Sequence, residues 1–145
     1  MIALIQRVSQ ARVEVEEQCI GSIGPGLLAL IGIEREDDET ACARLFEKIT
    51  HYRVFGDEQG RMNRSLLDQG GELLLVSQFT LAADTRKGTR PGFSKAAAPE
   101  RAKPLFDHLV RLAQSTLPTV QTGRFGADMR VSLVNDGPVT FWLEA

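Results

Sequence analysis

The sequence predicts a single α/β (α+β) domain, residues 1–145, in which a largely antiparallel or mixed β-sheet is packed by two main helices on one side. Three observations predict this class. The length suits one domain, apolar residues alternate with a period of two near both ends, and two apolar stripes recur at helical spacing. The chain is 43% hydrophobic and 25% charged, which is typical of a globular protein with an ordinary core.

Strands are expected mainly at the front and the back of the chain. Residues 2–15 alternate in polarity and predict a half-buried strand, which a polar turn separates from a returning strand at 19–23. Residues 27–33 are almost continuously apolar, as in a strand covered on both faces, and residues 72–79 are the most strand-like run. The remaining strands are expected at 53–55, 129–135 and 139–143. Hairpin order at both ends favours antiparallel pairing.

Two segments predict amphipathic helices. The first begins at the acidic residues from Asp37, which suit the positive end of a helix dipole, and its apolar stripe continues through Ile49. The second lies between Pro99, which suits a first helical turn, and Pro118, which ends the helix. Pro104 is expected near the true start of this helix, because a proline inside a helix removes a hydrogen bond.

The residue pattern argues against several kinds of site. Cys19 and Cys42 stand far apart without a Cys-x-x-Cys motif or paired histidines, so neither a zinc site nor a redox pair is expected. Both thiols are expected in the core of a protein from a reducing compartment. His51 and His108 fall at a helix end and within a helix, away from any nucleophile. Without a Walker loop or a dinucleotide fingerprint, an enzyme built from this chain is expected to work without a cofactor or a metal.

Charge and hydropathy limit the partners and the location. The net charge is −2, from 17 basic and 19 acidic residues, so any contact with nucleic acid is expected to be local. The bulk charge alone favours a small-molecule enzyme. The first residues lack a basic leader and a cleavage site, and no apolar stretch approaches about 18 residues. A cytoplasmic protein without membrane association is therefore expected.

Three segments carry candidate chemistry, and each also has a purely structural interpretation. Residues 77–82 place hydroxyl, amide and backbone N–H donors at a strand end, where they suit a developing oxyanion or simply mark a strand leaving the core. Residues 84–95 interleave cations with glycines and one aromatic ring, which suits phosphates and a base, or a solvated loop. Residues 135–140 suit a tight hairpin turn, or a rigid turn whose carbonyl oxygens gauge stereochemistry; their X-Pro bond is of the kind that adopts cis at modest cost.

Together these segments resemble the bacterial D-aminoacyl-tRNA deacylases, also called D-tyrosyl-tRNA deacylases, along essentially the whole chain. Four motifs in family-like order carry the resemblance: Ile5-Gln6-Arg7-Val8, Ser77-Gln78-Phe79-Thr80-Leu81, Lys87-Gly88-Thr89-Arg90-Pro91 and Asn135-Asp136-Gly137-Pro138-Val139-Thr140. The small or polar residue usual after Pro91 is here Gly92, which at most alters loop flexibility. The resemblance implies a deacylase-like fold and hydrolysis of the ester between a D-amino acid and the terminal ribose of tRNA.

The resemblance also implies a homodimer with two active sites at the subunit interface. Each site would join the Ser77 to Thr80 strand end of one chain to Gly137-Pro138 of the other. The Gly-Pro bond is implied to be cis, with its carbonyls facing the chiral centre, so that an L-residue clashes with rigid backbone while a D-residue turns toward open space. Because glycine has no side chain to clash, glycyl-tRNA is an implied second substrate.

Further roles follow from the same resemblance. Arg7 is expected to brace the Gly-Pro turn, and Asn135 to share in substrate selection. Either Phe79 or Phe93 is expected to contact the terminal adenine. The residues expected to bind tRNA are the loop cations Arg86, Lys87, Arg90 and Lys95.

Thr80 is expected to act either as a nucleophile or as a group that orients substrate and water together with Ser77. No base stands near Thr80 in the sequence to activate it, so we favour attack by water assisted by the ribose 2′-hydroxyl. The backbone N–H groups near Phe79 and Thr80 would then hold the oxyanion.

Two other classes of function stay open at this point. One is a binding module, a small dimer that holds single-stranded RNA ends without chemistry; a measurement of ester loss from D-aminoacyl-tRNA separates it from a deacylase. The other is an interface-active dimeric or trimeric α/β enzyme for a free metabolite. It fits the mild net charge and would ignore tRNA.

Overall fold

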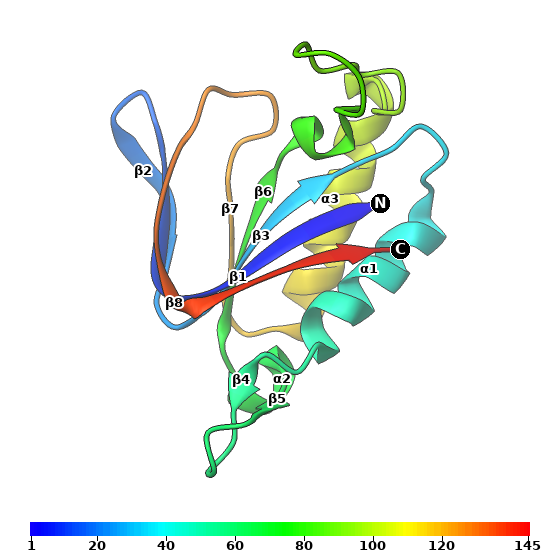
Figure 1. Cartoon of the computed structure of the whole chain (residues 1–145). Helices are drawn as coiled ribbons and strands as arrows, with labels where there is room; N and C mark the ends of the chain where they lie inside the picture. The colour runs from blue at the N-terminus through cyan, green and yellow to red at the C-terminus, as the bar shows by residue number, and fades with distance from the viewer.

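The computed structural model describes all residues from Met1 to Ala145, and its helices α1 and α3 cover one face of the main sheet (Figure 1). The elements in chain order are β1 (Ile2–Val15), β2 (Gln18–Ile23), β3 (Gly26–Gly32), α1 (Glu39–His51), β4 (Phe55–Gly56), β5 (Met62–Arg64), α2 (Leu66–Gln69), β6 (Glu72–Ser77), a 3-10 helix η1 (Phe79–Ala82), α3 (Pro99–Thr116), β7 (Val120–Thr122) and β8 (Arg130–Glu144). The predicted fold class is confirmed. No helix is long and apolar enough to cross a membrane.

The main sheet is mixed, in the order β2-β1-β3-β6-β7. β3 and β2 pair with successive parts of one edge of β1, and β8 pairs with the opposite edge. The long strand β1 runs antiparallel to β3 through residues 2–8 and to β2 through residues 11–15. β3, β6 and β7 are parallel to one another. These three strands can be parallel because helices connect them along the chain: α1 is in the connection from β3 to β6, and α3 is in the connection from β6 to β7. Parallel strands need such crossover connections. β4 and β5 form a separate small hairpin.

The core lies on both faces of β3 and β6. A cluster of 23 buried residues fills the space between the sheet and the helices and includes Leu45 of α1 and Leu109 of α3. A second cluster of seven buried residues lies on the opposite face and includes Leu74 and Val76. Burial on both faces explains why residues 73–76 are apolar without alternation, and each buried leucine among them stabilises the fold by about 1.5–3 kcal/mol.

The last strand differs from the prediction of two strands around a hairpin turn. β8 is continuous, and the halves before and after Gly137-Pro138 both pair antiparallel with β1. From Glu14↔Arg130 to Gln6↔Thr140, eight steps along β1 correspond to ten along β8, with register shifts on both sides of Val8. Gly137-Pro138 therefore lies in a bulge of a strand, a feature that bends the strand and redirects its residues.

Three smaller predictions are also corrected. α3 begins at Pro99, yet Pro104 lies inside it; the carbonyl that loses its partner belongs to Glu100, and both residues are exposed, so water can satisfy that group. The segment expected at 53–55 is a strand only from Phe55, and the short elements β5, α2 and β7 were not predicted. Cys42 is buried, and burial together with Asp37 raises the pKa of its thiol to about 11, but Cys19 is exposed rather than in the core.

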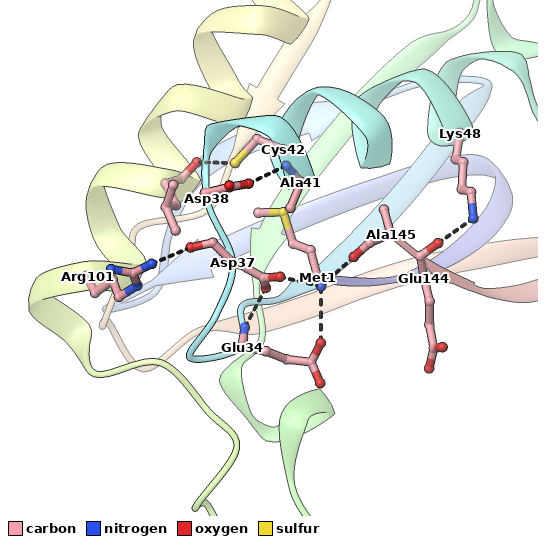
Figure 2. A network of polar contacts seen from close by, with 11 residues as sticks. Met1, Glu34, Asp37, Asp38, Ala41, Cys42, Lys48, Arg101, Glu144 and Ala145 are labelled. Atoms are coloured by element: carbon pink, nitrogen blue, oxygen red, sulfur yellow. Dashed lines mark hydrogen bonds and ion pairs between the residues drawn. The ribbon is translucent and has the colours of Figure 1, made fainter.

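The α-ammonium group of Met1 is buried and holds the turn that follows β3 (Figure 2). It lies 2.8 Å from Oδ1 of Asp37 and 3.1 Å from Oε2 of Glu34, and it donates to the carbonyl of Ala145 at 2.8 Å. The second oxygen of Asp37 accepts the backbone N–H of Glu34 at 2.7 Å, and its carbonyl accepts Nη2 of Arg101 at 2.8 Å. The turn at 34–37 is thus fastened to β1, β8 and α3.

Candidate active site

The end of β6 presents backbone donors without partners. The N–H of Gln78 donates to the carbonyl of Ile31 at 2.7 Å, which joins this end to β3. The next two N–H groups, of Phe79 and Thr80, begin the 3-10 helix and form no backbone hydrogen bond. The Gln78 amide donates to the Thr80 hydroxyl oxygen. Two free N–H groups and one held hydroxyl therefore share this strand end.

A cleft of about 630 Å³ opens beside the strand end. Its lining is mainly apolar, with 13 hydrophobic residues of 17, and the volume is in the range of small-ligand sites. The floor comes from β3 and β6, one wall from residues 93–102, and the other wall from residues 125–131. The lining residues are Ile31, Ile33, Val76, Ser77, Gln78, Phe79, Phe93, Ala96, Ala97, Ala98, Pro99, Ala102, Phe125, Gly126, Ala127, Met129 and Val131.

Two aromatic rings lie at the cleft. The ring centroids of Phe79 and Phe93 are 5.2 Å apart, at an interplanar angle of 48°. Their side chains nevertheless remain 59% and 42% exposed. Exposed aromatic faces beside an apolar cleft suit stacking on an unpaired base.

The basic loop is closed at its neck by Asp84. The N–H groups of Asp84 and Gly92 each donate to the other's carbonyl, at 2.7 and 3.1 Å. Arg86 binds the Asp84 carboxylate with two nitrogens, at 2.8 and 2.6 Å, and this contact holds the pKa of that carboxyl well below its usual range. Of the four cations expected to bind tRNA, Arg86 alone is ion-paired, which leaves Lys87, Arg90 and Lys95 without a carboxylate partner.

The Gly137-Pro138 peptide bond is cis. Gly137 has a φ of 139°, a region that side chains rarely adopt. A Cβ built on Gly137 would lie 2.8 Å from the backbone nitrogen of Val139 and 2.6 Å from its Cγ2. Glycine is therefore required here by both conformation and space.

Arg7 and Asn135 hold this turn from both sides. Nε of Arg7 donates to the Asp136 carbonyl at 3.0 Å, and its Nη1 donates to the Val54 carbonyl at 2.7 Å. The Asn135 amide donates to the carbonyls of Arg7 at 2.8 Å and Val139 at 3.0 Å. Two of these four hydrogen bonds fix the carbonyls of Asp136 and Val139, which flank Gly137-Pro138, and the other two fasten the Arg7 and Asn135 side chains to the neighbouring backbone.

Within one chain, this turn and the strand end lie apart. The turn is beside Arg7 of β1, and the register across β3 continues from Arg7 to Leu73, at the start of β6. Ser77 lies four residues further along, about 13 Å in the strand direction. The structure therefore gathers Ser77, Gln78 and Phe79 at the cleft, with Thr80 beside them. It holds Arg7, Asn135, Gly137 and Pro138 in a separate group.

The second wall of the cleft was not predicted from the sequence. It includes Phe125, Gly126 and Met129, which carry no charge and show no periodicity; the glycines on either side of Phe125 were the only signal. Neither His51 nor His108 lines the cleft, and no group of three or more His, Cys, Asp or Glu side chains is placed to hold a metal ion.

Sequence comparison places this chain among known proteins. A model of the family described as D-Tyr-tRNA(Tyr) deacylase matches residues 4–144. The chain is similar to a D-aminoacyl-tRNA deacylase of Pseudomonas aeruginosa (strain LESB58), with 61% identity over 145 residues and complete coverage of both chains. It is also similar to one of Thioalkalivibrio sulfidiphilus (strain HL-EbGR7), with 65% identity over 144 residues, covering 99% of this chain and 97% of that one.

Solved structures agree in fold. A protein described as c-Myc DNA Unwinding Element Binding Protein has a TM-score of 0.96 and 38% identity, covering 100% of this chain and 99% of that one. A structure described as a probable eukaryotic D-amino acid tRNA deacylase has a TM-score of 0.85 at 16% identity, covering 99% and 98%, and shows the fold alone. With a family match along nearly its whole length, this chain belongs to the D-Tyr-tRNA(Tyr) deacylase family.

Proposed function

We propose that this protein hydrolyses the ester of D-aminoacyl-tRNA in the cytoplasm, releasing free tRNA and the D-amino acid, and so proofreads the chirality of the amino acids used in translation. Membership of the family supports this reaction. The observation that carries the proposal is the strand end of β6, where two unpaired backbone N–H groups adjoin an apolar cleft. Fixed donors of this kind stabilise a developing oxyanion by a few kcal/mol without any titrating group.

The surroundings of the cleft suit the 3′ end of a tRNA. An apolar chamber with Phe79 and Phe93 exposed beside it accepts a base and the ester next to it. The unpaired cations Lys87 and Arg90 lie on the adjoining loop, where they suit phosphates. These features favour a substrate that is part nucleic acid over a free metabolite.

In the proposed reaction, water attacks the ester carbonyl, assisted by the ribose 2′-hydroxyl. The N–H groups of Phe79 and Thr80 hold the oxyanion; its collapse breaks the bond to the ribose oxygen, which takes a proton. Thr80 orients water or substrate, because no histidine lies in the cleft to activate it as a nucleophile. The residues invoked supply this reaction without a metal or a cofactor.

Replacement of Thr80 tests its role. Thr80→Ala is expected to lower kcat about tenfold, the effect of one orienting hydrogen bond, and Thr80→Ser to restore most of it. Single-turnover hydrolysis of D-tyrosyl-tRNA measures both. Complete loss of turnover in Thr80→Ala, with tRNA binding intact, would instead identify Thr80 as the nucleophile.

We further propose a homodimer in which Gly137-Pro138 of one subunit completes the cleft of its partner. The distance between this turn and the strand end of the same chain supports an arrangement in trans. Leu30, Leu4 and Trp142 support it as well, since they are neighbours across β3, β1 and β8 on the face that the helices leave open. Trp142 is 49% exposed in the single chain, and a second copy of this face would cover it.

In such a dimer the fixed carbonyls around Gly137 are the stereochemical gauge. An L-residue would drive its side chain into backbone atoms, which no rotamer change relieves, whereas a D-residue and glycine would fit. We expect hydrolysis of D-tyrosyl-tRNA and glycyl-tRNA, with L-tyrosyl-tRNA left intact, as measured by ester loss on the same tRNA preparation. Equal hydrolysis of D- and L-tyrosyl-tRNA would refute the gauge, and binding without ester loss would favour a binding module.

A further inference from the structure

The second wall of the cleft is built on a tight turn, Arg124 to Ala127. The Ala127 N–H donates to the Arg124 carbonyl at 3.2 Å, and Gly126, the third residue, has a φ of 77°. These are the features of a type II turn, whose third position favours glycine. Phe125 packs against Phe106 of α3, with ring centroids 6.1 Å apart, while it also lines the cleft. The turn is therefore fixed both by its own hydrogen bond and by α3.

Arg124 directly precedes the residues that form this wall. It is exposed and forms no ion pair. Arg130, further along, forms no ion pair either, but it lies in β8 opposite Glu14, whose carboxylate pairs with Arg12. The segment that carries Arg124 contains one carboxylate, Asp128, with which no ion pair forms. The wall opposite adjoins loop 84–95, which holds four cations against one carboxylate. Both sides of the cleft thus carry free positive charge in a chain of net charge −2.

We infer that the turn Arg124–Ala127 is a second RNA-binding element, in which Arg124 binds a backbone phosphate of the strand whose terminal nucleoside occupies the cleft. The inference rests on the proposed function. When the terminal nucleoside lies between the two walls of the cleft, its 5′ phosphate lies at the opening of the cleft. Cations next to either wall can then contact this phosphate. A guanidinium next to a residue that lines the cleft is placed for that phosphate, and Arg binds phosphate with two parallel hydrogen bonds.

The experiment compares two substrates that share the reacting ester. D-tyrosyl-tRNA carries the phosphates, and the 3′-O-D-tyrosyl ester of adenosine has the ester and the nucleoside alone. The quantity measured is the ratio of kcat/KM for the tRNA to kcat/KM for the nucleoside ester. Arg124→Glu is expected to lower this ratio at least about tenfold, and Arg124→Ala by less, because a charged hydrogen bond is lost without added repulsion. The slope of log kcat/KM for tRNA against log salt should become shallower by about 0.7 in Arg124→Ala.

Arg111→Glu is the matched control, since Arg111 is an exposed, unpaired arginine toward the far end of α3. It is expected to keep the wild-type ratio. A wild-type ratio in Arg124→Glu, an equal loss on both substrates, or an equal change in Arg111→Glu would each overturn the inference. A wild-type protein that hydrolyses neither substrate would instead reject the proposed function, so the two failures are distinguishable.

Discussion

Replacement of Gly137 by alanine is expected to lower kcat/KM for D-tyrosyl-tRNA about 100-fold, the effect of a displacement near 1 Å at a reacting centre. The new Cβ would lie 2.6 Å from Cγ2 of Val139, at a φ that alanine rarely adopts, so the turn has to move. Gly60→Ala is the matched control: its φ is 77°, yet its Cβ would meet nothing within 4 Å. It should keep wild-type activity, and equal losses in both variants would show that the effect is on backbone stability alone.

Gly137→Ala, combined with a second variant, also tests whether the site is shared between subunits. The second variant is Phe79→Pro, which removes one of the two free N–H groups at a position where the 3-10 helix begins and proline is tolerated. It is expected to reduce kcat by about 10²–10³, whereas Phe79→Ala, which keeps the N–H, should lose less.

When Gly137→Ala and Phe79→Pro proteins are mixed and allowed to exchange subunits, a mixed dimer with sites in trans regains one intact site. Activity should then rise toward a quarter of wild type, because about half of the dimers are mixed and each has one working site. No rise after verified subunit exchange would contradict the shared site.

Asp37→Asn is expected to lower the free energy of unfolding by about 3 kcal/mol, because it leaves the buried ammonium of Met1 without its nearest carboxylate. Asp37 is 7% exposed and also accepts the Glu34 N–H. The decrease in Tm should be about 6–12 °C, measured by thermal unfolding beside urea titration.

Glu34→Gln is the control, because this partner of the ammonium is 38% exposed and is expected to contribute no more than about 1 kcal/mol. Equal effects of the two substitutions would show that the buried carboxylate has no special role. Activity should fall together with stability in Asp37→Asn, because backbone hydrogen bonds connect this region to the cleft. The Arg35 N–H donates to the Lys95 carbonyl at 2.9 Å, and the Ala97 N–H donates to the Ile33 carbonyl at 3.0 Å. These bonds join the turn to the wall of the cleft.

The parts of the fold that follow from local periodicity were predictable. The alternation in β1 and the helical stripe of α1, with its N-cap at Asp38, reflect interactions within one element. The parallel pairing of β6 was harder to predict from the sequence, because it depends on where the crossover helices place the strand. β7 is three half-buried residues long, too short for its period to be recognised.

The candidate site was predictable in its residues but not in its arrangement. The motif at Ser77 to Phe79 predicted a pocket rim, and the cleft lies there. The sequence could not show that Gly137-Pro138 interrupts one strand rather than joining two, because turn residues look alike in both settings. The other wall escaped prediction because apolar residues such as Phe125 line the cleft through their packing, which depends on α3.

The bulge in β8 also limits how this strand can change in length. Ten steps along β8 match eight along β1, so the excess is two residues, an even number. Because side chains alternate with a period of two, an even excess leaves the strand beyond the bulge in phase. Deletion of a single residue between Asp136 and Val139 would slide the end of β8 by one position. It would turn Leu143, now 5% exposed, away from the core and bring Trp142 inward. Insertions or deletions at this turn therefore preserve the fold only when they add or remove an even number of residues. A single-residue change that keeps the strand in phase has to be a substitution.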